Sequence, residues 1–356
     1  MALIVRAVDV GFGNTKLVTA VGAGGDMRCA SFPSRAYPSP RDPAKALGGE
    51  GRKTFAIPLD GLYYEVGPDV MLAADAFRAT EIPGDYIETP QYLALARGAL
   101  RMMKAEVIDL LVVGLPVAAF AAKRAALEKL MTGRHDVGGG KTVTVHKTLV
   151  MAQPNGALID YATQHDQVEA MEHEQSLVID PGSRTFDWLV ARGMKLSSKQ
   201  SYSVDRGVSN VLQLIADDIS QEIGQPYTNL DLIDYALRRG KGLSVYQRQY
   251  NPARMRPMVE IIAKDAVAAM MRRIGGAFNV QHVILVGGGA FLFRKAVKQA
   301  FGTHQILEVK EPMFANVRGY QIAGMNYAQS VLASVSVSAS RPRAAASEGE
   351  KEGEGA

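Results

Sequence analysis

The chain of 356 residues contains a single cysteine, Cys29, and no long apolar run. One cysteine excludes an internal disulfide and fits a reducing compartment, so we expect a cytoplasmic protein in which Cys29 is inert and half-buried. No apolar stretch approaches the roughly 20 residues that a membrane span requires. The first residues have a strand pattern rather than a basic segment followed by an apolar core, which predicts neither a secretion signal nor membrane contact.

An excess of charge of one sign is also missing. The 40 basic and 36 acidic residues leave a formal net charge of +4, and the basic residues are scattered rather than gathered into one block. No helix-turn-helix, zinc or arginine-rich motif accompanies them, so any contact with DNA should be indirect. The six histidines show no metal-ligand spacing. Any catalytic metal should therefore be a nucleotide-bound cation held by carboxylates and water.

What the sequence does contain is a pair of similar loops in its two halves. Residues 9–16 follow the apolar run Leu3-Ile4-Val5, and residues 180–187 follow the apolar run 176–179. Each is a strand that ends in aspartate, followed by a turn with glycine and a second apolar run. Such a hairpin can present backbone N–H groups to phosphate oxygens while the aspartate faces a bound metal. Two of them predict two lobes that bind one nucleotide from opposite sides.

A third motif is the run Gly287-Gly288-Gly289-Ala290-Phe291, which follows the apolar run 283–286. Consecutive glycines let the backbone lie flat against a planar base and ribose, where a Cβ atom would clash. A flexible turn is the alternative interpretation. Strand and helix patterns alternate along the chain, which predicts an α/β fold.

The length suggests about two domains. We expect domain I over residues 1–172, domain II over 173–311, and a helix over 312–333 that returns to domain I. A proline-rich stretch of about residues 30–90 predicts a small subdomain inserted into domain I, and residues 240–257 have the pattern of a basic loop. Residues 334–356 consist largely of serine, alanine, glycine and glutamate, which cannot bury a core and predict a disordered tail.

The order of these motifs resembles that of the superfamily of actin, sugar kinases and heat-shock chaperone ATPases. In that superfamily two phosphate segments, two connecting segments and an adenosine segment follow one another. The phosphate segments resemble residues 9–16 and 180–187, the connecting segments resemble 150–158 and 315–324, and the adenosine segment resembles 287–291. The resemblance implies an actin-like, ribonuclease H-like fold of two lobes with a nucleotide cleft between them.

Within the superfamily, the sequence of residues 8–16 and 205–210 is most similar to that of the ParM/StbA group of plasmid-segregation actins. That resemblance implies ATP and Mg²⁺ as cofactors, self-assembly into a homopolymer, and a DNA-binding adaptor protein as partner. The glycine run admits either purine, so GTP use stays open. Ser183 and Arg184 stand where the family often has glycine. Arg184 is either an exposed turn residue or a contact to the phosphates.

The chemistry expected of such a site assigns roles to four residues. Asp9 and Asp180 lie at equivalent places in the two loops, so they should act in catalysis and hold the magnesium through its water shell. Lys16 would bring a cation to the phosphates, unless it is an exposed strand residue. Gln153 would orient the attacking water, unless it only begins a helix before a proline. The nucleotide-binding residues expected from the motifs are Gly11, Phe12, Gly13, Asn14, Thr15, Lys16, Gly182, Ser183, Arg184, Thr185, Gly207, Asn210, Gly287, Gly288, Gly289, Ala290 and Phe291.

Three functional classes share this fold. A small-molecule kinase needs a sugar pocket with a catalytic aspartate, and a chaperone needs a large peptide-binding region; the sequence has a signature of neither. A cytomotive filament needs only the ATPase body and self-complementary surfaces. We therefore expect a filament-forming, actin-like ATPase of plasmid or DNA segregation. The alternative is a non-filamentous actin-fold small-molecule kinase or nucleotide sensor.

Overall fold

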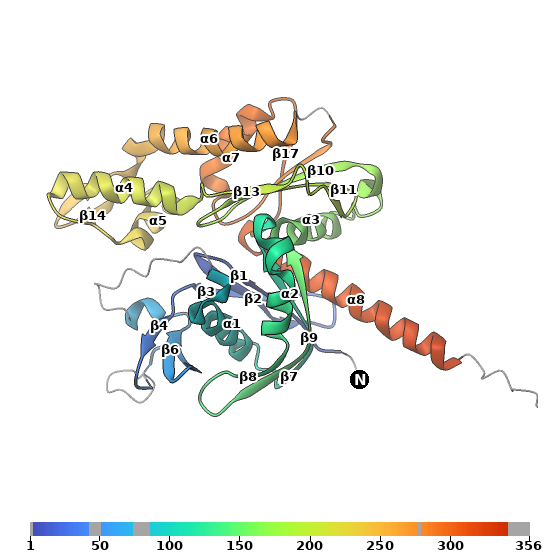
Figure 1. Ribbon diagram of the computed structural model, residues 1–356. Helices are drawn as coiled ribbons and strands as arrows, with labels where there is room; N and C mark the ends of the chain where they lie inside the picture. Colours follow the sequence, from blue (N-terminus) through green and yellow to red (C-terminus); the bar gives the residue numbers. More distant parts are fainter. Residues whose placement is uncertain (1–2, 43–50, 74–85, 277–278, 341–356) are drawn as a thin grey trace, which may run out of the picture.

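The computed structural model describes residues 3–42, 51–73, 86–276 and 279–340. Figure 1 shows two lobes, one above the other, each with helices packed around a sheet. The N-terminal part of the chain forms the lower lobe in that view, and residues 175–308 form the upper one. This architecture confirms the predicted α/β fold of two lobes.

The first sheet has six strands in the order β3-β2-β1-β7-β9-β8. β1 (Val5–Val10) pairs antiparallel with β2 (Asn14–Val21) and parallel with β7 (Val107–Leu115). The strand is buried on both faces: Val8 packs with α1 (Pro90–Met102), and Ala7 packs on the opposite side with the C-terminal helix. The other elements of this lobe are β3 (Met27–Pro33), α2 (Val117–Met131), β8 (Gly133–Asp136) and β9 (Thr142–Ala152).

The second sheet repeats the same local topology. β10 (Gln175–Pro181) pairs antiparallel with β11 (Phe186–Arg192) and parallel with β16 (His282–Leu285). The order is β12-β11-β10-β16-β17, and β13 also pairs with β11. Each lobe therefore begins with a hairpin whose first strand is central in a sheet. The remaining elements are β12 (Lys195–Leu196), β13 (Tyr202–Val204), α6 (Arg256–Ile274), α7 (Ala290–Ala300) and β17 (Ile306–Glu308).

Each lobe also carries a smaller subdomain. On the first lobe, β4, β6 and β5 form a three-stranded sheet. Because β3 belongs to the large sheet, the inserted subdomain begins after Pro33 rather than at about residue 30. The elements of the small subdomain are β4 (Tyr37–Ser39), β5 (Phe55–Leu59), β6 (Leu62–Val66), η2 (Val70–Ala73) and η3 (Tyr86–Glu88).

The smaller subdomain of the second lobe corrects the interpretation of residues 240–257 as a loop. They contain the hairpin β14 (Leu243–Val245) and β15 (Arg248–Tyr250), followed by a short 3-10 helix, η5 (Pro252–Met255). The sequence pattern was too short to predict strands here, and the tight turn uses positive φ angles at two residues other than glycine. The hairpin packs with α4 (Val208–Ile223) and α5 (Leu230–Arg239).

Two helices cross where the lobes meet, α3 (Gln153–Gln164) and α8 (Ala315–Ser340). Their backbones touch at two glycines: a Cβ atom on Gly319 would lie 1.7 Å from the carbonyl oxygen of Gly156. Beside this contact the buried Asp160 accepts hydrogen bonds from Nε and Nη2 of Arg318, at 2.9 and 2.7 Å. The crossing fixes the position of both helix N-termini, which carry residues of the site.

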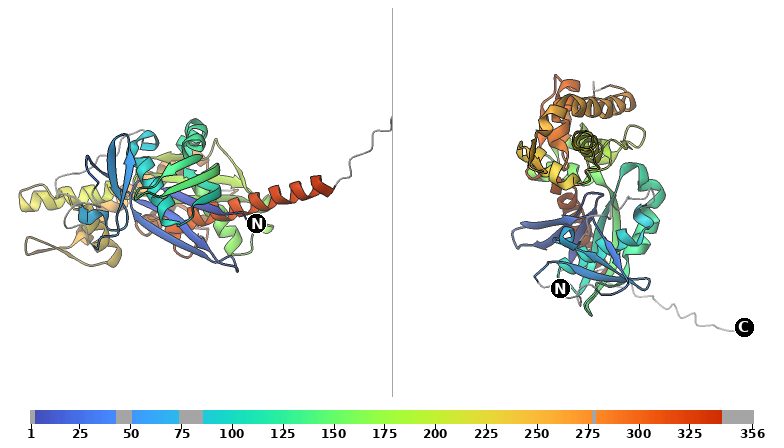
Figure 2. Two further views of the ribbon diagram at one scale, coloured as in Figure 1. Left: turned by 90° about the horizontal axis from the view of Figure 1, so that it is seen from below. Right: turned by 90° about the vertical axis from the view of Figure 1, so that its left-hand side faces the viewer.

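α8 is longer than predicted. It runs to Ser340 rather than ending at residue 333, so residues 334–340, predicted as part of the disordered tail, are helical. The physical reason is that this segment of serine, valine and alanine contains no glycine or proline before Pro342. Figures 1 and 2 show the helix projecting away from both lobes. The rest of the predicted tail, residues 341–356, lies outside the described residues, as do residues 43–50 and 74–85 of the inserted subdomain.

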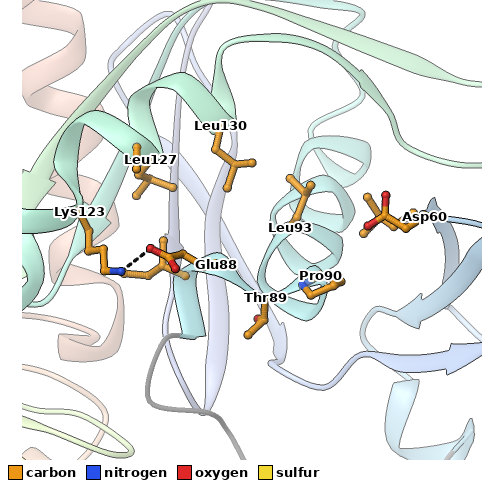
Figure 3. Close-up of a pocket in the computed structure, with 11 residues that line it drawn as sticks. Asp60, Glu88, Thr89, Pro90, Leu93, Lys123, Leu127 and Leu130 are labelled. Carbon is orange, nitrogen blue, oxygen red and sulfur yellow. Dashed lines mark hydrogen bonds and ion pairs between the residues drawn. The ribbon is translucent and has the colours of Figure 1, made fainter.

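A cavity of about 330 Å³ opens between the small subdomain and helices α1 and α2 (Figure 3). Its lining is mostly apolar, with the Lys123–Glu88 ion pair at one side. None of its lining residues belongs to the predicted nucleotide-binding segments. In the part of the chain that the structure describes, no helix is long and apolar enough to cross a membrane. Cys29 is partly buried, and burial raises the pKa of its thiol to about 11, so it stays protonated at neutral pH.

Candidate nucleotide-binding site

The two aspartates predicted to act together lie at the ends of topologically equivalent strands. Asp9 ends β1 opposite Lys16, and Asp180 lies near the end of β10 opposite Asp187. Asp9 is 1% exposed and Asp180 is 7% exposed. The charge of Lys16 acts on both carboxylates. The fold therefore brings one carboxylate from each lobe to a common, buried position.

Both carboxylate oxygens of Asp9 accept hydrogen bonds. Oδ2 accepts from Nζ of Lys16 at 2.9 Å, and Oδ1 accepts from Nε2 of Gln153 at 2.8 Å. The Lys16 side chain is only 18% exposed. Burial lowers its pKa, but the charge and hydrogen bond of Asp9 and the charge of Asp180 outweigh that effect, so the net pKa is raised. Lys16 is thus a partly buried cation paired with Asp9 and not an exposed strand residue.

Gln153 lies at a helix start, and its side chain points to the first aspartate. It is the first residue of α3, ahead of Pro154, and its side chain also reaches Asp9. Because a carboxylate only accepts hydrogen bonds, the amide nitrogen must face Asp9. The amide oxygen has no hydrogen-bond partner among the described residues. It is therefore available to accept a hydrogen bond from a water molecule.

Asp180 is enclosed by residues that the sequence did not single out as its partners. Nδ2 of Asn316, at the start of α8, donates to its Oδ2 at 2.6 Å. Gly287 has φ +82° and packs so tightly that a Cβ atom would lie 2.1 Å from Oδ1 of Asp180. Burial raises the pKa of Asp180, while Lys16 and Asn316 lower it and Asp9 raises it again; the net change is upward. Asn316 falls in a predicted connecting segment, but its contact depends on the helix crossing.

The second loop and the glycine run form one packed unit. The turn closes through a hydrogen bond from the Gly182 amide to the Thr185 carbonyl at 2.8 Å, and the Gly289 amide donates to the Pro181 carbonyl at 2.9 Å. Gly207 lies against the backbone of this loop, since a Cβ atom there would come within 2.3 Å of the Arg184 carbonyl carbon.

Asn210 and Thr15 use their side chains inside the protein. Oδ1 of Asn210 accepts a hydrogen bond from the Gly207 amide at 2.9 Å, at the start of α4. Thr15 is fully buried, and its hydroxyl shares a hydrogen bond with that of Ser34 at 2.9 Å. In the first loop the Gly11 amide donates to the Asn14 carbonyl at 3.2 Å. These contacts shape the loops, and the buried Thr15 side chain turns away from the expected phosphate position, whereas Asn210 is exposed.

Asp187 links the second phosphate loop to the first lobe. Its Oδ2 accepts from the Thr185 hydroxyl at 2.5 Å, and its Oδ1 accepts from the Ser203 hydroxyl. The backbone amide of Val117, at the first residue of α2, also hydrogen-bonds to this carboxyl group. Burial raises its pKa to about 7, while these hydrogen bonds lower it and the charge of Asp180 raises it. Both oxygens of Asp187 are therefore engaged within the protein.

At the glycine run, where the nucleotide base is expected to bind, the structure places an arginine that was not predicted from the sequence. Phe291 is 42% exposed at the start of α7. The guanidinium carbon of Arg238, from α5, lies 4.8 Å from the centroid of its ring, and Nη1 donates to the Gly288 carbonyl at 2.8 Å. No local sequence signal links α5 to the glycine run, because the contact depends on how the smaller subdomain packs.

The site fits a magnesium nucleotide. Lys16 and the backbone amides of two glycine-containing turns suit phosphate oxygens. Oδ1 of Asn316 is buried and has no hydrogen-bond partner among the residues that the structure describes, which leaves an acceptor beside Asp180. No group of three or more acidic, histidine or cysteine side chains that could hold a metal ion occurs among the described residues. Asp9 and Asp180 would therefore share a cation with phosphate oxygens and water.

Each lobe matches a known protein family. Residues 7–156 match the family described as actin like proteins, N terminal domain. Residues 178–299 match the family described as archaeal actin homologue MreB-like, C-terminal. The first match contains most of β1, all of β2 and the start of α3, and the second contains the end of β10, all of α4 and nearly all of α7. The chain is an actin-like protein. No curated protein matches it.

Solved structures agree with this assignment. The crystal structure of Ta0583, an archaeal actin homolog, has a TM-score of 0.74 at 22% identity, covering 91% of this chain and 100% of that one. Its complex with ADP has a TM-score of 0.71 at 21% identity with the same coverage. A 15-stranded ParM filament from Clostridium botulinum has a TM-score of 0.69 at 16% identity, covering 92% of this chain and 100% of that one. At these identities the likeness establishes the fold.

Proposed function

We propose that the chain binds ATP with Mg²⁺ between its lobes and hydrolyses it, and that the bound nucleotide controls assembly into filaments. The observation that carries the proposal is the group of two buried carboxylates, Asp9 and Asp180, with the partly buried side chains of Lys16 and Gln153, which strands β1, β2 and β10 and helix α3 bring together. Burying two carboxylates costs free energy of folding. Groups of buried ionisable side chains are therefore typical of functional sites.

The residues of the site divide the work of phosphoryl transfer to water. When bound, magnesium supplies positive charge to the phosphate oxygens. Asp9 and Asp180 would hold its water shell, and Lys16, whose raised pKa keeps it cationic at neutral pH, would bind phosphate oxygens. Because the transition state is loose, positioning and charge stabilisation account for most of the catalysis. Gln153 would orient the attacking water through its amide oxygen, and an amide is too weak a base to remove the proton.

Replacing Gln153 by alanine is expected to slow ATP turnover about 10-fold or more while nucleotide affinity stays close to that of the parent. The reason is that water positioning contributes to the transition state rather than to binding. Single-turnover phosphate release and a titration with labelled nucleotide would measure the two quantities. Filaments of the variant should also persist longer after ATP is consumed.

Gln164→Ala is the matched control, because Gln164 lies at the other end of α3 and also donates to a carboxylate, that of Asp160, at 2.8 Å. It should hydrolyse ATP at the parental rate. Equal turnover in Gln153→Ala and the parent, or filaments that disassemble equally fast, would count against the water-positioning role.

The filament proposal rests on the fold, because a filament needs only the two-lobed ATPase body and self-complementary surfaces. The similar ParM from Clostridium botulinum forms a 15-stranded filament, and we extend filament formation to this chain as a cytoplasmic, plasmid- or DNA-segregating polymer. A DNA-binding adaptor protein would link the polymer to DNA. The alternative is an actin-fold small-molecule kinase or nucleotide sensor that stays monomeric. Electron microscopy of the purified protein with ATP and magnesium should show filaments, and their absence during ATP hydrolysis would favour the alternative.

A chain truncated after Ser340 is expected to hydrolyse ATP and to pellet as polymer like the full-length chain. The sequence removed, residues 341–356, contains four glutamates and cannot bury a core, so filament contacts should lie on the folded body. Capture of an adaptor or of DNA complexes is the activity expected to fall. A truncated protein that is folded and binds nucleotide, yet fails to polymerise in a sedimentation assay, would place an assembly contact in the tail.

A further inference from the structure

The two phosphate loops touch each other directly across the lobes. A Cβ atom added to Gly13, in the first loop, would lie 2.8 Å from Cβ of Ser183, in the second. Beside this contact, the guanidinium carbon of Arg184 lies 5.0 Å from the centroid of the Phe12 ring. Phe12 follows β1 and Arg184 follows β10, so the pair joins the two sheets at the turns that are expected to hold one nucleotide.

Each partner is oriented from its own lobe. The Phe12 ring stacks on Tyr86 at 4.9 Å between centroids, and Tyr86 in turn packs edge-on against Tyr92 of α1 at 5.5 Å. Nε of Arg184 donates to Oδ1 of Asp205 at 3.2 Å. The ring is thus held by the core of the first lobe, and the guanidinium is held by the segment that leads into α4. Such mutual orientation favours a specific contact over a chance approach of two surface side chains.

The contacts of Arg184 argue against a role on the phosphates. Its guanidinium is engaged by a ring and a carboxylate, and 31% of the side chain is exposed. The interior of the site already has a partly buried cation, Lys16, which pairs with Asp9 and also interacts with the charge of Asp180. A cation over an aromatic face is attracted by the ring quadrupole, and the attraction is strengthened by partial removal from water. The pair therefore stabilises the apposition of the two loops.

We propose that Arg184 and Phe12 form an interlobe clasp that keeps the loops closed over bound nucleotide and so slows its release. This inference rests on the proposed binding of nucleotide by these loops. Arg184 is a positioning residue in this account: it acts through Phe12 on the lobe arrangement. Opening the lobes to release ADP requires the ring and the guanidinium to separate, so the strength of their contact adds to the barrier for dissociation.

The test is a double-mutant cycle on the dissociation rate of a fluorescent ADP analogue from the full-length protein with magnesium. Arg184→Ala and Phe12→Leu are each expected to raise the rate about two- to five-fold, as the magnitude of a partly exposed cation–π contact implies. The double variant should be no faster than the faster single variant, because either change alone breaks the contact. Phe12→Trp should slow release in the parent but not when combined with Arg184→Ala.

Arg239→Ala is the matched control. The guanidinium carbon of Arg239 lies 4.5 Å from the ring centroid of Tyr235, and both residues belong to α5 within one lobe. Its loss removes a comparable contact without uncoupling the lobes, so ADP release should stay at the parental rate.

Additive effects of Arg184→Ala and Phe12→Leu would overturn the clasp. So would a loss of single-turnover hydrolysis of about 100-fold in Arg184→Ala with unchanged ADP release, which would instead assign Arg184 to the phosphates. If the parent protein binds no nucleotide at all, the proposed function fails together with the clasp. Binding by the parent with additive variants overturns the clasp alone.

Discussion

Replacement of Asp180 by alanine is expected to reduce ATP hydrolysis about 100-fold or more, because it removes one of the two carboxylates that approach the site from opposite lobes. The loss also leaves the Asn316 amide without its acceptor and Lys16 with a single buried counter-charge. Measured phosphate release under saturating ATP and magnesium would report the change.

Asp187 is the other carboxylate at the second loop, and it is expected not to compensate. Its two oxygens accept hydrogen bonds from Thr185 and Ser203, and the N-terminus of α2 holds the group in place. Asp180→Asn, which keeps the size of the side chain, should lose activity to a similar degree and would show that charge rather than packing is responsible. Phosphate release near the parental rate in both variants would refute the site assignment.

Replacement of Gly319 by alanine is expected to lower the free energy of unfolding by about 3 kcal/mol or more. The new Cβ atom would meet the Gly156 backbone, with the carbonyl oxygen only 1.7 Å away, so the two helices would have to separate. Separation would also move Gln153 and Asn316, which sit at the N-termini of α3 and α8. Denaturant unfolding should therefore show lower stability, and residual folded protein should hydrolyse ATP slowly.

Gly302→Ala provides the comparison, because a Cβ atom at Gly302 would have no neighbour within 4 Å. Its effect on the unfolding free energy should stay within about 0.5 kcal/mol. If Gly319→Ala unfolds at the same denaturant concentration as Gly302→Ala, the helices do not cross as closely as described.

The parts of the fold that could be predicted from the sequence are those that depend on local sequence patterns. An apolar strand that ends in aspartate, followed by glycine and a second apolar run, predicts a hairpin wherever it occurs, and both such hairpins are present as β1–β2 and β10–β11. Apolar spacing over residues 117–131 and 230–239 also predicts helices, and these are present as α2 and α5 with the same ends. The order of the motifs along the chain then indicated how the lobes are assembled.

Contacts between distant segments could not be predicted in this way. Asn316 reaches Asp180, Arg238 reaches the glycine run, and Arg184 reaches Phe12, only because helices and lobes pack as they do. Thr15 shows the converse, since its position in the first loop suggested a ligand contact while its side chain turns into the core toward Ser34. Side-chain direction within a loop depends on tertiary packing, which a motif does not encode.

The central claim, that bound ATP drives polymer assembly and its hydrolysis at this site reverses it, is tested most directly by sedimentation of the purified protein with magnesium and either ATP or ADP. We expect protein in the pellet with ATP, little with ADP, and a return to the supernatant after the ATP has been hydrolysed. Asp180→Ala protein, assayed in parallel, should fail to show that return. A protein that hydrolyses ATP and stays in the supernatant with either nucleotide, at every concentration tested, would contradict the account.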